Sequence, residues 1–162
     1  MKGTNNGVYL GIDPGIADTG FGVIKKNGAD LICLAYGSIK TPKDEKIENR
    51  LNQLYQDLKF IIDKYQPVCS GVEQLFFTNN AKTAIIVGEA RGVILLTLAQ
   101  AAVPIREYTP LQIKQAISTY GKAEKAQVQR MVQVILKLQS IPKPDDAADA
   151  LAIAICTATS IR

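Results

Sequence analysis

Short apolar runs near the start of the chain alternate with turn signals and predict β-strands. The first run covers residues 8–13 and ends in Asp13, after which Pro14-Gly15 breaks the strand and makes a turn. Residues 20–24 and 31–39 form two further runs, separated by an Asn-Gly hairpin signal. Three consecutive strands joined by short turns predict an antiparallel meander.

The remaining segments show helical periodicity or short buried runs, bounded by turn and capping signals. In chain order we expect a helix opening at residues 41–44 and ending at 65, a strand at 68–73, a helix at about 82–102, a strand at 104–108, and helices from a capping box at 109–112 to about 118, at about 124–138 and at 147–159. Parallel strands need crossover helices. The order therefore predicts an α/β fold, a five-stranded mixed sheet with helices on both faces, in one domain spanning residues 1–162.

The composition narrows the chemistry that this fold can carry. The chain has 162 residues, 47% of them hydrophobic and 21% charged, as in ordinary globular proteins. It has no histidine, which excludes serine–histidine and cysteine–histidine catalysis and histidine zinc sites. Three cysteines without a C-x-x-C motif indicate core thiols in a reducing compartment. With no signal peptide and no run near ~18 apolar residues, we expect a soluble, cytoplasmic protein without membrane contact.

One predicted helix has no polar face. Residues 92–99 are apolar nearly all round. Such a segment is either deep core or a subunit interface. In a domain of this size we favour an interface, formed by the helix around residues 91–102.

Acidic residues stand where two strands and one helix would meet. Asp13 and Glu73 each end a predicted strand, and parallel neighbouring strands would bring both to one rim of the sheet. Asp146 and Asp149 are spaced i, i+3 and share one helix face, while Asp145 precedes them. Acids can simply cap turns and helix N-termini, which leaves a structural role open for Asp13, Asp145 and Asp146. Asp149 lies among small and apolar residues, where a charge needs a partner.

Carboxylates without histidine favour hard cations such as Mg²⁺ or Mn²⁺. Two such ions roughly 3.5–4 Å apart can clamp the attacking and leaving oxygens of a phosphodiester. A basic stretch accompanies the acids: residues 109–143 carry six basic side chains against Glu124 alone, namely Lys114, Lys122, Lys125, Arg130, Lys137 and Lys143. This stretch is either a phosphate-binding face or a solvated helical surface.

Five blocks of sequence, in order along nearly the whole chain, resemble the RuvC family of bacterial Holliday-junction resolvases. They are Gly11-Ile12-Asp13-Pro14-Gly15 with Thr19-Gly20, Glu73-Gln74, Glu89-Ala90-Arg91-Gly92, Ala123-Glu124-Lys125-Ala126-Gln127-Val128, and Asp146-Ala147-Ala148-Asp149 with Ala150-Leu151-Ala152-Ile153-Ala154. The resemblance implies a ribonuclease-H-like nuclease domain, a homodimer, and Mg²⁺-dependent symmetric nicking of four-way DNA junctions that leaves 5′-phosphate and 3′-hydroxyl ends. RuvA and RuvB, the branch-migration complex of the family, are possible partners.

The resemblance also assigns roles to residues. It implies that Asp13, Glu73, Asp146 and Asp149 bind the metal, with Asp145 competing for the Asp146 position. Phe76 matches an aromatic residue that stacks on bases, although Phe77 offers a second candidate. Lys114 and Lys125 match lysines facing the scissile phosphate, and we add Lys122 of the basic stretch as a DNA contact.

Three other functional classes share parts of this sequence pattern. A sugar-kinase or actin-like ATPase begins with a similar strand and Asp-x-Gly turn but needs a second lobe, for which the chain is too short. A relative acting on RNA, or one that only binds nucleic acid, shares the fold, although four intact acids argue against an inactive site. A dimeric scaffold built on the apolar helix would leave the acids unexplained.

Overall fold

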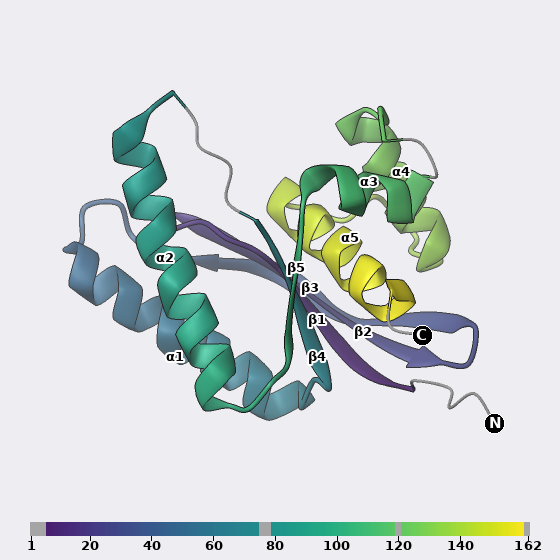
Figure 1. The fold of residues 1–162 in the computed structure, drawn as a ribbon, viewed down its shortest axis with the longest axis horizontal. Helices are drawn as coiled ribbons and strands as arrows, with labels where there is room; N and C mark the ends of the chain where they lie inside the picture. The colour runs from purple at the N-terminus through teal and green to yellow at the C-terminus, as the bar shows by residue number, and fades with distance from the viewer. Residues whose placement is uncertain (1–5, 75–78, 119–120, 161–162) are drawn as a thin grey trace.

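A five-stranded mixed sheet forms the centre of the computed structural model, which describes residues 6–74, 79–118 and 121–160. The strand order is β3-β2-β1-β4-β5 (Figure 1). The expected meander is present, because β1 (Gly7–Asp13), β2 (Asp18–Asn27) and β3 (Asp30–Lys40) pair antiparallel. The strands β4 (Cys69–Glu73) and β5 (Ile105–Tyr108) continue the sheet in parallel with β1. The predicted topology is confirmed.

Helices cover both faces of the sheet, as expected (Figure 1). The helices α1 (Ile47–Tyr65) and α2 (Ala81–Gln100) pack on one face around a core that includes Leu10 and Ile12. On the other face lies α5 (Asp145–Ser160), flanked by α3 (Pro110–Ser118) and α4 (Lys125–Ile135), around a core that includes Tyr9. The alternation of side chains along β1 thus divides the interior into two cores.

Several helix ends differ from the prediction. The first helix begins at Ile47 because Thr41 is tied back to the β1–β2 connection, its N–H donating to the carbonyl of Ala17. The fourth helix ends at Ile135, and Lys137 beyond it has a left-handed φ of 53°. By contrast, the capping box holds: Thr109 and Gln112 exchange side-chain-to-backbone hydrogen bonds of 2.9 and 3.1 Å at the start of α3.

The close approach of α5 to the sheet depends on glycines in β1 and β2. A Cβ atom on Gly11 would lie 2.0 Å from the carbonyl oxygen of Ala150, and one on Gly20 would lie 2.1 Å from that of Asp146. Only glycine allows a helix backbone this near to a strand. The contact fixes the first turns of α5 beside the carboxyl end of β1.

The α2 helix corrects one sequence-based expectation. Among the described residues it is the one helix long and apolar enough, by length and composition, to cross a membrane, so the prediction that no run comes near that is wrong. The helix also carries charged residues, and one of them, Arg91, pairs with Glu107 of β5. Buried Ile94 and Leu98 face the core, while Ile85 and Leu96 are 63% and 56% exposed. The helix is therefore not deep core, and the interface alternative stays a prediction.

No disulfide joins the three cysteines, and Cys69 and Cys156 are buried, as expected of core thiols. Cys33, on the edge strand β3, is only partly buried, so the prediction of a core position is not met for this residue.

Candidate metal centre

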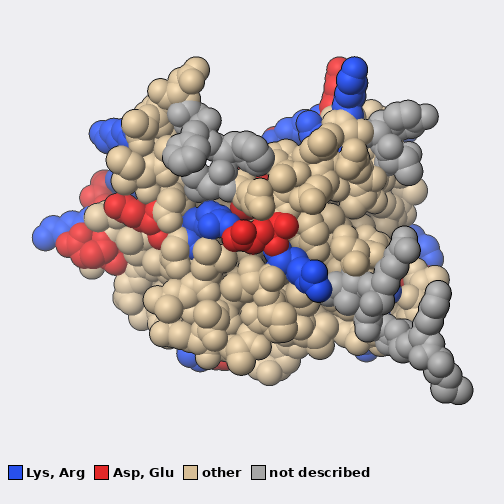
Figure 2. Space-filling model, in the orientation of Figure 1, with Lys and Arg blue, Asp and Glu red and all other residues tan. Residues whose placement is uncertain are grey.

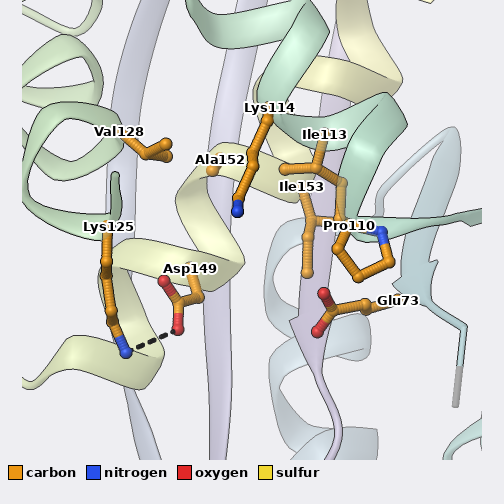
Figure 3. A pocket seen from close by; sticks show the side chains of 9 residues that line it. All are labelled: Glu73, Pro110, Ile113, Lys114, Lys125, Val128, Asp149, Ala152 and Ile153. Atoms are coloured by element: carbon orange, nitrogen blue, oxygen red, sulfur yellow. Dashed lines mark ion pairs between the residues drawn. The ribbon is translucent and has the colours of Figure 1, made fainter. Parts of the chain in front are cut away.

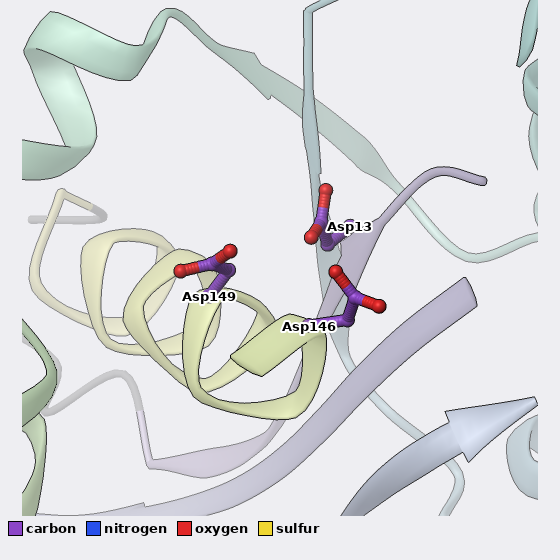
Figure 4. Close-up of side chains that lie close together, drawn as sticks. All are labelled: Asp13, Asp146 and Asp149. Atoms are coloured by element: carbon purple, nitrogen blue, oxygen red, sulfur yellow. The ribbon is translucent and has the colours of Figure 1, made fainter. Parts of the chain in front are cut away.

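Three of the predicted acids meet at one point of the structure. Asp13, Asp146 and Asp149 each offer one carboxylate oxygen, and these three atoms lie within 4.8 Å of one another (Figure 4). Asp13 ends β1, and the other two come from successive turns of α5. The i, i+3 spacing places both α5 carboxylates on the side of the helix that faces the strand end.

Glu73 is not one of these three acids, but it lies beside them, because its side chain shares a hydrogen bond with that of Asp13. The Ile12–Val72 pair belongs to the parallel ladder of β1 and β4, so the acids that follow share one rim of the sheet. Gly11 and Gly71 both lie beneath α5, and side chains two residues further point to the same face. The expectation that both acids lie at the same edge is confirmed.

The electrostatics of the group favour a bound cation. Burial, followed by the charges of Glu73, Asp149 and Asp146, raises the pKa of Asp13 from 3.8 to about 8, and the protonated carboxyl hydrogen-bonds Glu73. Burial also raises the pKa of Glu73, Asp146 and Asp149. The charge of Asp149 adds to the rise at Glu73, that of Asp146 to the rise at Asp149, and that of Asp18, outside the group, to the rise at Asp146. The donor set is all oxygen and strongly repulsive when ionised, which fits a hard divalent ion.

Asp145 lies outside this group. Its side chain is 54% exposed, against 32% for Asp149, and its Oδ2 is 3.7 Å from Nζ of Lys125 while its Oδ1 is 3.7 Å from Nζ of Lys143. A hydrogen bond from Gln129 and these cations lower the pKa of Asp145. Asp146, rather than Asp145, therefore faces the other acids. The helix begins at Asp145, two residues before the predicted start, so both acids lie in its first turn.

A cavity of about 210 Å³ adjoins the acids (Figure 3). Apolar side chains of α3, α4 and α5 form its inner wall, and Glu73 and Asp149 form its acidic side. Lys114 points into the cavity between these two acids, and Lys125 reaches Asp149 at 3.4 Å (Figure 3). The cavity thus combines two acidic side chains with two positively charged ones.

Other predicted contacts are less well placed. Lys122 is exposed and does not line the cavity. Phe76 and Phe77 lie outside the described residues. The basic stretch is partly neutralised, because Lys125 and Lys143 pair with Asp145 and Lys137 pairs with Asp30. On the face drawn in Figure 2, charges of both signs lie side by side near the centre within a largely uncharged surface.

Sequence reasoning missed two residues around the site. Asp18 on β2 raises the pKa of Asp146 by its charge and is itself held by Ser38 and Lys40. Gln129 is buried and anchors Asp145. The spacing of Lys125 and Gln129, one helical turn apart, was the available signal for a shared partner.

Comparison with known proteins places the chain in a family. Residues 9–157 match the family described as crossover junction endodeoxyribonuclease RuvC, a range that includes all four predicted ligands. The chain belongs to the RuvC family. RuvC proteins of Desulforamulus reducens and Halothermothrix orenii are each 54% identical to it, over 93% of both chains in the first case and over 96% of this chain and 94% of the other in the second.

A solved RuvC structure has the same fold. It is described as T. thermophilus RuvC in complex with Holliday junction substrate, and it matches with a TM-score of 0.91 and 36% identity over 96% of this chain and 95% of that one. The resemblance to RuvC and the ribonuclease-H-like fold that it implied are confirmed.

Proposed function

We propose that this protein is an endonuclease that resolves four-way DNA junctions in recombination and DNA repair. The observation that carries the proposal is a set of four acids at the carboxyl ends of β1 and β4 and at the start of α5. They lie beside a cavity that Lys114 and Lys125 line. Membership of the RuvC family, and the junction named with the T. thermophilus relative, support DNA junctions as the substrate.

The metal ligands in this proposal are Asp13, Glu73, Asp146 and Asp149. They would hold Mg²⁺, two ions in each site, with Mn²⁺ as a substitute, because every donor is a carboxylate oxygen. Such a pair of ions activates a water molecule and stabilises the leaving oxygen of a phosphodiester. Burial raises the pKa of all four acids, and charges of other members of the group add to the rise at Asp13, Glu73 and Asp149, which supports this assignment.

The lysines would bind the DNA backbone. Lys114 and Lys125 line the cavity beside the acids, so a phosphate that approaches Glu73 and Asp149 meets two positive charges. Lys122, exposed at the approach to α4, adds a further phosphate contact outside the cavity. Phe76 would stack on a base near the crossover.

A second copy of the chain would supply the second cut. We propose a homodimer formed by the helix around residues 91–102, where exposed Leu96 gives α2 an unpaired apolar surface. Two sites in one dimer account for symmetric nicks in strands of like polarity, and hydrolysis that releases the 3′ oxygen leaves 5′-phosphate and 3′-hydroxyl ends. We further expect the enzyme to work in the cytoplasm, with RuvA and RuvB as possible branch-migration partners.

Cleavage of a synthetic four-way DNA junction tests the proposal. Linear duplex and an RNA–DNA hybrid serve as control substrates, each in Mg²⁺ and in EDTA. We expect paired nicks that ligase can seal, on the junction alone and only with Mg²⁺. Binding without nicks in Mg²⁺ would contradict the proposed activity, and cutting of the hybrid instead would move the protein to RNA-directed chemistry.

A further inference from the structure

Lys125 is shared between two carboxylates with different surroundings. Its Nζ lies 3.4 Å from Oδ2 of Asp149, inside the acidic group, and 3.7 Å from Oδ2 of Asp145, outside it. The two acids stand four residues apart on α5, so they share a helix face and the ammonium group lies within reach of both. A small movement of the lysine side chain would exchange one partner for the other.

We propose that Asp145 is a positioning residue that takes over the ammonium group of Lys125 when Asp149 turns to a metal ion. The proposal rests on the metal site proposed above. A divalent cation at Asp149 and the lysine repel each other and compete for the same carboxylate. With Asp145 in place, the lysine has a second anionic partner and can release Asp149 without leaving the rim of the cavity.

Asp145 is oriented for this role by its other contacts. Gln129, buried one turn beyond Lys125 on α4, hydrogen-bonds it. Lys143 lies 3.7 Å from Oδ1, which leaves Oδ2 for Lys125.

The position of Lys125 gives a reason for the second partner. Lys125 is the first residue of α4, where the helix dipole disfavours a cation. It also lines the cavity that contains Lys114 and Glu73, where the proposed substrate phosphate would arrive. Asp145 therefore keeps the positive charge beside the cavity while the metal occupies the acids.

The test is Mn²⁺ affinity of the full chain, measured from the electron paramagnetic resonance signal of free Mn²⁺. We expect Asp145→Asn to weaken binding about two- to fivefold, because an exposed ion pair contributes on that scale. Asp145→Glu should restore most of the affinity. Lys125→Gln should bind Mn²⁺ more tightly than the wild type, and adding Asp145→Asn to it should cause little further change.

A matched control removes the same charge elsewhere. Asp63→Asn breaks the exposed pair between Lys59 and Asp63 on α1 and should leave Mn²⁺ affinity unchanged. Equal weakening by Asp145→Asn with and without Lys125 would overturn the inference, since Asp145 would then act only through its own charge. No weakening in either background, or no Mn²⁺ binding by the wild type, would overturn it as well.

Failure of the proposed function would be visible separately. If the wild type does not cut junctions but the Mn²⁺ affinities of the wild type and its variants follow the expected pattern, the role of Asp145 at the metal site stands and the assigned substrate is wrong. If junctions are cut and the Mn²⁺ pattern is absent, the function stands and the positioning role falls.

Discussion

Replacement of Asp13 by Asn is expected to stabilise the metal-free protein at neutral pH, although the proposed metal site is built on Asp13. Burial and the neighbouring acids raise its pKa from 3.8 to about 8. Folding at pH 7 therefore forces this carboxyl group to take up a proton that the unfolded chain has released. Asparagine is neutral in both states, and its amide can donate the hydrogen bond that the protonated carboxyl gives Glu73.

The magnitude follows from the shift in pKa. The unfolded chain binds fewer protons than the folded protein between about pH 4 and pH 8, so wild-type stability falls as pH rises through that window. Each pH unit is worth up to about 1.4 kcal/mol. About three units separate pH 7 from the usual pKa of an aspartate, which sets an upper limit of about 4 kcal/mol on the gain from Asp13→Asn. At about pH 4 the two proteins should be nearly equal.

Urea unfolding in EDTA at several pH values between about 4 and 8 measures this difference. Asp63→Asn serves as the control, because it removes a carboxylate from an exposed ion pair on α1 and should follow the wild type. A wild type and Asp13→Asn that differ by the same amount at every pH would refute the reasoning, as would a variant that is less stable at pH 7.

Divalent metal should narrow the difference in stability between the two proteins. A cation that binds only the folded wild type stabilises it by about 2.7 kcal/mol at 100 times its dissociation constant. The variant lacks one ligand and should gain less. If saturating Mn²⁺ raised the stability of both proteins equally, Asp13 would not be a ligand.

Three further predictions concern the other parts of the structure. Asp149→Asn should lower junction cleavage about 100-fold or more, since even outer-shell changes at metal sites cost up to that much, while loss of junction binding in Mg²⁺-free buffer would count against Asp149 as a ligand. Leu96→Glu should convert the proposed dimer to monomer in sedimentation velocity; a wild type that is already monomeric would contradict the interface. Gly11→Ala should lower the free energy of unfolding, measured in urea, by about 3 kcal/mol or more, because its Cβ would meet the backbone of α5. Gly88 has open space around it, so Gly88→Ala should raise the free energy of unfolding by up to about 1 kcal/mol. Equal effects of the two substitutions would refute the packing argument.

The ends of β1 and β4 could be predicted because local and global signals agree there. Each strand is a short apolar run that stops at an acid, and the β-α-β order makes the two strands parallel neighbours. A further signal was present but unused: Gly11 and Gly71 stand two residues before Asp13 and Glu73. Since alternate residues share a face, a glycine under a helix predicts that the acid beyond it points toward that helix.

The choice between Asp145 and Asp146 shows where sequence reasoning was weaker. The i, i+3 spacing favoured Asp146, but a capping role was open for both acids. The structure separates them through the partners of Asp145. Lys125 and Gln129 are distant from it in sequence, and Lys143 is two residues away. The spacing of Lys125 and Gln129 indicates a shared helix face, but nothing in the sequence indicates which acid that face contacts. The same holds for the first helix, which starts late because Thr41 bonds to a distant turn.

The packing that brings the acids together also places them under electrostatic strain. Glycines in β1 and β2 let the backbone of α5 touch the sheet. This contact brings Asp146 and Asp149 close to the carboxyl group of Asp13 at the end of β1. Moving the helix outward would relieve the repulsion of the acids but would open the core around Leu151, which is fully buried. Packing of α5 therefore opposes the repulsion, which the proposed cation would remove. This is why stabilising Asp13→Asn and destabilising Gly11→Ala should both disable the proposed metal site.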